Sequence, residues 1–298
     1  DMTYNGEKES HIGLANKFKI LKDKGIKVLV LPGNHDLENE MALAFEGDAT
    51  RPVKTVTIEE FEEIYKDYGY GKDDPDVVSR DKKSLNYVYQ LGNKCHLIMV
   101  ETSTKGNDQT ISNSSYRWIE KWLRKAKDMN MRVIGVSHQN ILAHNKLFIA
   151  GYKITNSSRL VDLYNKYNVR INLSGHMHIQ HMAEHKRVHD IALACLGLYP
   201  NLYGVLDMDL RNNMTYHTES LDVAYWMKKY KHQDSDLLDF ENTSREYFVR
   251  CTRLQTEKQL AKLDLSKEDK EMMMDFMVDT NIHYFSGSLD KRPDLSPD

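Results

Sequence analysis

Three polar side chains follow directly after a short apolar run near the start of the chain. The run covers residues 27–31, and a Pro-Gly pair separates it from Asn34, His35 and Asp36. Continuous β-branched and leucine residues are typical of a strand buried on both faces, and Pro-Gly is typical of a turn. Because α/β folds bind ligands at the C-terminal ends of parallel strands, these side chains could act as a ligand, an acid and an orienting base. An ordinary polar turn is the alternative for this motif alone.

Two further predicted strands also lead into histidines. The apolar run at residues 132–136 precedes His138, and the run at residues 169–173 precedes His176 and His178. Two residues apart in an extended segment, the imidazoles of His176 and His178 could face the same way, toward one metal ion or two adjacent ones. Three strand ends with polar side chains therefore converge on one edge of the predicted sheet.

Together with Asn34 and Asp1, these histidines form a set of nitrogen and oxygen donors without a thiolate. Such a set suits zinc, iron or manganese better than it suits a cysteine-rich structural zinc site or an all-oxygen calcium site. The cysteines are widely spaced, which favours buried or incidental thiols over a disulfide framework. The sequence therefore predicts a metal centre with mixed ligands.

Alternating helices and strands are expected to position these residues. Helical spacing of apolar residues, with stop and cap residues at the ends, predicts helices at about 7–24, 58–68, 114–129 and 157–167. A β-hairpin is predicted from 84–91 to 94–102 across Gly92 and Asn93. The first helix and the strand at 27–31 form half of a βαβ unit, which puts Asp1 at the same sheet edge as Asn34. Residues 179–217 alternate and turn often, as expected for strands of a second sheet.

The length and composition of the chain fit an α/β core domain with an additional C-terminal segment. The chain has 298 residues and a formal net charge of −3, which provides no electrostatic signal for a nucleic-acid partner. No apolar run is long enough to span a membrane, and no signal peptide is visible; the chain opens on Asp1, so its natural start is left open. From Ser220 the composition shifts to charged helical stretches, so we expect a core at 1–219 and a helical extension at 220–298. The oligomeric state does not follow from the sequence.

These motifs in this order resemble the calcineurin-like metallophosphoesterases, a family of binuclear metallophosphatases. The matching segments are Asp1, Gly33-Asn34-His35-Asp36, His138 and Gly175-His176-Met177-His178. The resemblance covers most of the first 180 residues. It implies a four-layer α/β/β/α sandwich that holds two metal ions bridged by an aspartate and a hydroxide. It also implies that the protein is a phosphatase or phosphodiesterase that hydrolyses a small-molecule phosphate ester with this hydroxide as the nucleophile.

The resemblance assigns a role to each metal-ligand candidate. Asp1 matches the bridging aspartate of the family. Asn34, His138 and His176 match the ligands of one metal ion, and His178 matches a ligand of the other. The two ions would be zinc, iron or manganese.

The resemblance also suggests which residue is the general acid that protonates the leaving group. His35 matches the histidine that contacts the phosphate and protonates the leaving oxygen, with Asp36 as its partner. Asn5, His11 and His144 flank the motif segments and could line the substrate pocket, although solvated loop positions are the favoured explanation for each.

One departure from the family pattern leaves two other functions open. The family begins with an Asp-x-His motif that supplies two further ligands to the second metal ion, and no such motif precedes Asp1. An upstream first strand that carries this motif would explain its absence; without it, the second metal site is incomplete. A non-catalytic phosphoesterase-like binding or scaffold protein is one alternative, and a cyclic-nucleotide phosphodiesterase is another. Similar sequences suggest an extracytoplasmic protein of a Gram-positive bacterium, with a cytoplasmic location as the alternative.

Overall fold

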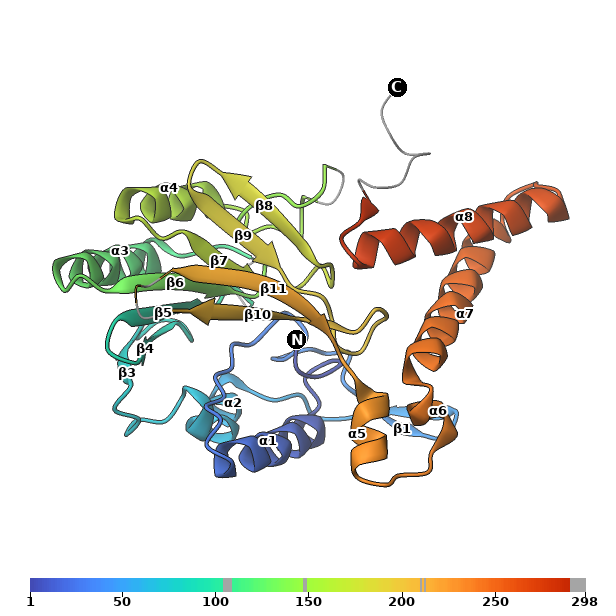
Figure 1. Ribbon diagram of the computed structural model, residues 1–298, viewed down its shortest axis with the longest axis horizontal. Helices are drawn as coiled ribbons and strands as arrows, with labels where there is room; N and C mark the ends of the chain where they lie inside the picture. The colour runs from blue at the N-terminus through green and yellow to red at the C-terminus, as the bar shows by residue number, and fades with distance from the viewer. Residues whose placement is uncertain (104–108, 147–148, 210, 212, 290–298) are drawn as a thin grey trace. The chain divides into compact units, whose positions relative to one another are not determined.

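The chain is divided into two compact units, which are described separately (Figure 1). The computed structural model describes residues 1–103, 109–146, 149–209, 211 and 213–289. The first unit comprises residues 1–176 and 182–191, and the second comprises 177–181 and 192–298. The domain boundary expected between residues 219 and 220 stays a prediction.

A seven-stranded mixed sheet forms the centre of the first unit, in the order β3-β4-β5-β6-β7-β9-β8. Its strands are β3 (Val77–Arg80), β4 (Tyr87–Leu91), β5 (Cys95–Val100), β6 (Arg132–Ser137), β7 (Ile171–Ser174), β8 (His181–His185) and β9 (Val188–Ala192). The strands β5, β6 and β7 run parallel, with Val100 opposite Ser137 and Val136 opposite Leu173. Their C-terminal ends therefore lie side by side, and the segments that follow β6 and β7 start from the same edge.

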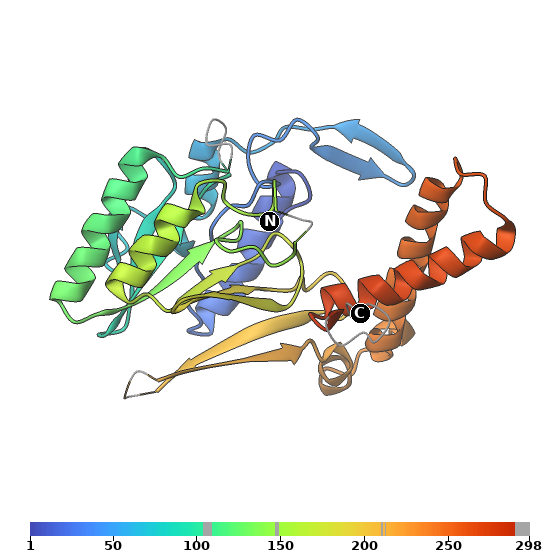
Figure 2. The same cartoon turned by 90° about the horizontal axis from the view of Figure 1, so that it is seen from above.

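Helices cover both faces of this sheet (Figures 1 and 2). The helices α3 (Asn113–Asp128) and α4 (Ser157–Tyr167) pack in one apolar cluster, which includes Ile98. The helices α1 (Lys8–Asp23) and α2 (Ile58–Ile64) pack in a second cluster, which includes Met99. Successive strand residues point to opposite faces of a sheet. Ile98 and Met99, which are adjacent on β5, therefore pack against the helices on opposite faces.

Local sequence signals account for several of these elements. Thr57 and Glu60 form the reciprocal capping box that starts α2. Gly25, which follows α1, has a φ of +80°, and Gly92 in the β4–β5 turn has a φ of +61°. Both glycines occupy left-handed backbone conformations that a side chain disfavours. The predicted helices and the predicted hairpin are thus confirmed to within a few residues.

The strand expected at residues 27–31 is wrong, because this segment pairs with no strand in the described part of the chain. The N–H of Val30 donates to the carbonyl oxygen of Tyr68 at 3.0 Å, and the hydroxyl of Tyr87 donates to the carbonyl oxygen of Val30 at 2.8 Å. The backbone N–H and carbonyl groups of Val30 are thus bound by the Tyr68 carbonyl and the Tyr87 hydroxyl, and not by the backbone of a neighbouring strand. The segment still leads into the turn at residues 33–36.

Some elements of the first unit were not predicted. A hairpin of β1 (Leu43–Glu46) and β2 (Ala49–Pro52) occupies a stretch for which no strand was predicted. The strands β8 and β9 were expected in a second sheet but join the main sheet beside β7. Periodicity within a strand does not indicate which neighbour it pairs with, and this explains the error.

The second unit combines a two-stranded sheet with helices. The strands β10 (Leu202–Met208) and β11 (Met214–Ser220) pair antiparallel. The helices that follow are α5 (Val223–Lys229), α6 (Ser235–Leu238), α7 (Phe240–Leu260) and α8 (Lys267–Phe285). None of the helices in the described residues combines the length and apolar character needed to cross a membrane. The chain is thus a mixed α/β protein with a helical C-terminal region, as predicted.

Candidate metal centre

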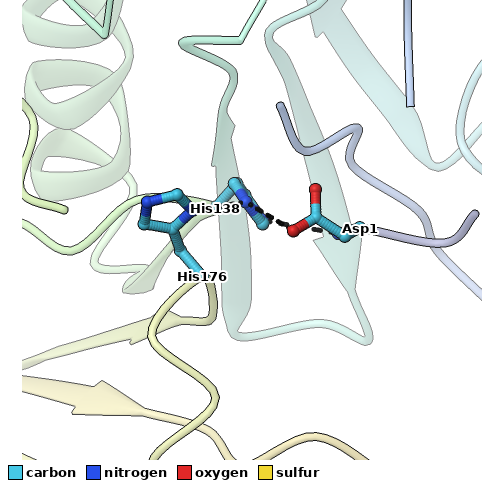
Figure 3. A group of neighbouring side chains, drawn as sticks. All are labelled: Asp1, His138 and His176. Atoms are coloured by element: carbon cyan, nitrogen blue, oxygen red, sulfur yellow. Dashed lines mark hydrogen bonds and ion pairs between the residues drawn. The ribbon is translucent and has the colours of Figure 1, made fainter. Parts of the chain in front are cut away.

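Asp1, His138 and His176 lie together at the edge where β6 and β7 end (Figure 3). One potential ligand atom of each lies within 4.8 Å of the other two. The Nε2 atom of His138 is central, 3.3 Å from Asp1 Oδ2 and 3.1 Å from His176 Nδ1. The amide oxygen of Asn34 also lies 2.9 Å from His138 Nε2. The fold therefore gathers four of the predicted ligands from distant parts of the chain.

The donor set and its spacing fit a metal ion. Ligand atoms that bind a common ion at about 2.0–2.2 Å lie about 3 Å from one another. The distances from His138 Nε2 to the oxygen atoms of Asn34 and Asp1 and to Nδ1 of His176, which are 2.9, 3.3 and 3.1 Å, match this spacing. The ring of His176 donates from Nε2 to the carbonyl oxygen of Gly151 at 2.9 Å. Because Nε2 carries the proton, Nδ1 of a neutral ring keeps its lone pair toward the cluster, an arrangement common in metal-ligating histidines. Burial lowers the pKa of His176 below its ordinary value, which favours this neutral form.

Backbone features hold the ligand-bearing turns in place. The N–H of Gly175 donates to the carbonyl oxygen of His138 at 2.9 Å, which links the segments after β6 and β7. His176 has a φ of +65°, a strained conformation for a residue with a side chain. A Cβ atom at Gly33 would lie 2.2 Å from Asp1 Oδ1 and 2.6 Å from a ring carbon of His138. A glycine is therefore required at this position for the cluster to close.

His35 lies beside the cluster. Its backbone N–H donates to Asp1 Oδ1 at 3.0 Å. Its ring Nδ1 lies 2.8 Å from the carbonyl oxygen of Tyr4 and 3.2 Å from Asn5 Oδ1. A carbonyl oxygen only accepts, so Nδ1 carries a proton and Nε2 is the ring atom through which His35 could exchange a proton with a ligand.

The Asp36 carboxylate holds the backbone around the cluster. It is fully buried, and Oδ2 accepts from the N–H of Gly33 at 2.8 Å. Its Oδ1 accepts from the N–H groups of Met2 and Thr3 at 2.7 and 2.9 Å. The structure shows Asp36 joining residues 1–3 to the turn at residue 33; its assignment as the partner of the His35 ring stays a prediction. These bonds hold the backbone next to Asp1 and next to Asn34.

The three pocket candidates occupy different surroundings. Asn5 is buried beside His35. His11 is buried between the hydroxyl of Tyr65 at 2.8 Å and the carbonyl oxygen of Asp36 at 2.9 Å, so it anchors α1 to the motif turn. Burial lowers the pKa of His11 below its ordinary value, against the opposing charge of Asp36.

The third candidate, His144, lies next to a residue that the sequence analysis missed. His144 is buried, with Nε2 3.3 Å from Asp190 Oδ2. Asp190 is fully buried on β9, and its Oδ2 accepts from the N–H groups of Ile141 and Leu142 at 2.6 and 2.9 Å. Its Oδ1 accepts from Ser174 Oγ at 2.9 Å. Asp190 thus ties the loop after His138 to the end of β7; an acidic residue beside apolar ones in a strand was the signal that could have identified it.

His178 belongs to the second unit. Its backbone has a φ of +58°. Its role as a ligand of a second metal ion therefore stays a prediction.

Two family models match the sequence. The model described as calcineurin-like phosphoesterase matches residues 1–180. The model described as the C-terminal domain of cyclic nucleotide phosphodiesterase matches residues 222–297. No protein with a curated description matches the chain.

Several solved structures resemble the chain at low identity. GAP50, the anchor in the inner membrane complex of Plasmodium, is 15% identical over 45% of each chain, with a TM-score of 0.30. A "putative 5′-nucleotidase" from Staphylococcus aureus in complex with α-ketoglutarate is 13% identical over 55% of this chain and 34% of that one, with a TM-score of 0.34. A dimetal phosphatase from Danio rerio is 11% identical over 70% of each chain, with a TM-score of 0.43. The chain thus spans less than half the length of the first two.

Proposed function

The chain belongs to the calcineurin-like phosphoesterases, and on this basis we propose that it is a metal-dependent hydrolase of phosphoric esters. The observation that carries this proposal is the convergence of Asp1, Asn34, His138 and His176 beside His35. A carboxylate, an amide and two imidazoles suit a borderline divalent ion, and an acid beside them suits the departure of an alcohol.

Four ligands have a proposed position in the first unit. Asp1, Asn34, His138 and His176 would hold one metal ion, and the assignment of His178 to a second ion stays a prediction. The chemistry that such ions supply is a hydroxide nucleophile near neutral pH and neutralisation of the phosphoryl charge. Zinc, iron and manganese all fit the donor set.

His35 supplies the proton for the leaving oxygen in this proposal. The Tyr4 carbonyl holds its Nδ1–H, which orients the ring and leaves Nε2 for the substrate. Histidine is suited to this role because its charge changes near neutral pH. The contact between the His35 N–H and Asp1 Oδ1 supports this proposal, because it joins the proposed acid to a proposed metal ligand.

The test combines metal analysis with ester hydrolysis. The purified protein, loaded with zinc, manganese or iron, is assayed with a chromogenic phosphate monoester and a chromogenic diester. We expect stoichiometric metal and hydrolysis of at least one ester, and loss of both in His138→Ala. The substitution Lys125→Ala on α3 is the control, because this exposed residue lies outside the cluster. A protein that binds metal tightly but hydrolyses neither ester is instead a phosphoesterase-like binding or scaffold protein.

A cyclic-nucleotide phosphodiesterase is the second candidate function. It is supported by the match of residues 222–297 to the C-terminal domain of cyclic nucleotide phosphodiesterase. A panel of 3′,5′-cyclic and 2′,3′-cyclic nucleotides, assayed beside non-nucleotide diesters, separates the two candidates: equal rates on both groups would argue against a cyclic nucleotide. An extracytoplasmic location in a Gram-positive bacterium stays a prediction.

A further inference from the structure

Three large apolar side chains are exposed on the two segments that adjoin His35 and Asn5. They are the side chains of Tyr4, Met41 and Phe45, which are 69%, 67% and 65% exposed; together they are called the apolar rim. The rings of Tyr4 and Phe45 meet edge to face, with centroids 6.4 Å apart. Single exposed apolar residues are common, but exposed apolar side chains that contact one another, as the rings of Tyr4 and Phe45 do, are a feature of interaction and ligand sites.

The rim is joined to His35 through direct contacts within the first unit. The carbonyl oxygen of Tyr4 accepts from His35 Nδ1 at 2.8 Å. Asn5, whose Oδ1 lies 3.2 Å from the same ring atom, donates from Nδ2 to the carbonyl oxygen of Met41 at 3.2 Å. Phe45 lies on β1 of the hairpin that continues from Met41 (Figure 2). The residues that set the position of His35 therefore also carry the rim.

We propose that the apolar rim binds the leaving alcohol of the substrate, and that this alcohol carries a flat aromatic ring. The inference rests on the proposed function, in which His35 protonates the leaving oxygen. Whatever group is attached to that oxygen must then lie beside His35, away from the charged phosphoryl group at the metal ligands. Two exposed rings set edge to face present a surface on which an aromatic group gains offset or edge contacts that a short alkyl group cannot make.

A pair of non-hydrolysable phosphonates tests this binding without any turnover. Phenethylphosphonate and propylphosphonate carry the same headgroup and differ in the ring. Their affinities for the metal-loaded protein are measured by calorimetry. We expect phenethylphosphonate to bind roughly tenfold more tightly, as expected for one good aromatic contact.

Two variants locate the effect. Phe45→Ala should reduce the ratio of the two affinities toward one, and Tyr4→Phe, which keeps the ring, should preserve it. Met129→Ala removes an exposed apolar side chain of similar size at the end of α3 and serves as the matched control. The corresponding phenethyl and propyl phosphate esters, which have leaving groups of similar acidity, should show the same ratio in kcat/KM.

The outcomes separate this inference from the proposed function. If the protein has no hydrolytic activity but shows a ring preference that Phe45→Ala removes, the apolar rim binds an aromatic group and the proposed hydrolase function is wrong. If both esters are hydrolysed without a ring preference, the proposed role of the apolar rim is wrong and the proposed hydrolase function stands. A ring preference that Phe45→Ala does not change also overturns the proposed role of the rim. A variant that changes the oligomeric state but not the affinity ratio shows that the rim is a contact between copies of the chain, which overturns it as well.

Discussion

At the scale of single residues, the Asp1 carboxylate connects the two chemical parts of the proposed site. Its Oδ2 lies 3.3 Å from His138 Nε2 among the proposed metal ligands, and its Oδ1 accepts from the His35 N–H at 3.0 Å. A change at one part is therefore expected to affect the other. Removal of a ligand and removal of the acid should nevertheless have different kinetic signatures, because only the acid acts on the leaving group.

Replacement of His35 tests the acid. In His35→Ala we expect turnover of an alkyl phosphate to fall by about 10²–10⁴-fold, the usual contribution of general acid catalysis. An aryl phosphate with a good leaving group needs little protonation, so its turnover should fall far less. The measurement is kcat for both esters at saturating metal. Equal losses on the two esters would count against the assignment.

Replacement of Gly33 tests the close packing of the cluster. In Gly33→Ala the added Cβ would overlap Asp1 Oδ1 and the His138 ring, at 2.2 and 2.6 Å. We expect a large loss of metal affinity, measured by titration with zinc or manganese. Gly13→Ala in α1 is the matched control, because its Cβ meets nothing within 4 Å. It should keep the metal affinity and stabilise the protein by about 0.5–1 kcal/mol. Unchanged affinity in Gly33→Ala would contradict the geometry of the centre.

At the scale of elements, β9 supports the site through Asp190. This buried carboxylate accepts from the N–H groups of Ile141 and Leu142 and from Ser174 Oγ. The loop after His138 and the end of β7 before His176 therefore depend on one side chain of a third strand. The buried Asp190–His144 contact belongs to this support and not to the ligand cluster.

Asp190→Asn should weaken metal binding without changing any ligand. An amide replaces one acceptor oxygen with a donor, which leaves N–H groups of the loop unpaired. We expect a 10–100-fold lower metal affinity, as is typical when groups behind metal ligands are removed, and a stability loss of about 1–3 kcal/mol. Asp162→Asn on the exposed face of α4 is the control. A stability loss with unchanged metal affinity would show that Asp190 only holds the core.

The packing of α1 predicts a pH dependence of stability. The folded protein holds His11 between Tyr65 and Asp36 with a pKa below its ordinary value of 6.5. The unfolded chain therefore binds more protons in acid, and the stability that His11 contributes above pH 6.5 is lost as the pH falls toward the folded pKa. In His11→Gln the decrease in thermal midpoint between pH 7.5 and 5.5 should be smaller than in the wild type. An equal decrease in both proteins would contradict this.

At the scale of the whole molecule, the proposed metal ligands come from chain positions 1, 34, 138 and 176. Metal binding should therefore stabilise the first unit against unfolding, because the ligands come together only in the folded chain. Free metal at about 100 times its Kd should add about 2.7 kcal/mol, or roughly 5–10 °C in the unfolding midpoint.

The three tryptophans allow this stabilisation to be measured in the first unit. Trp118 and Trp122 lie on α3, and Trp226 lies on α5 of the second unit. In a Trp226→Phe background the fluorescence transition reports only the first unit. A chelator should reverse the metal-dependent shift, and His138→Ala should abolish it. A shift that persists in His138→Ala would place the bound metal elsewhere.

The sequence by itself determined the helices, the β4–β5 hairpin and the identity of the metal-ligand candidates. These features depend on periodicity, caps and turn residues within a few positions, as Thr57 and Gly92 illustrate. Only the tertiary structure decided that Asp36 holds the backbone of residues 1–3, that Asp190 supports the His138 loop, and that residues 27–31 pair with no strand in the described chain. The reason is that a buried carboxylate binds the N–H groups that packing brings to it, and those groups lie up to 49 residues away in the sequence.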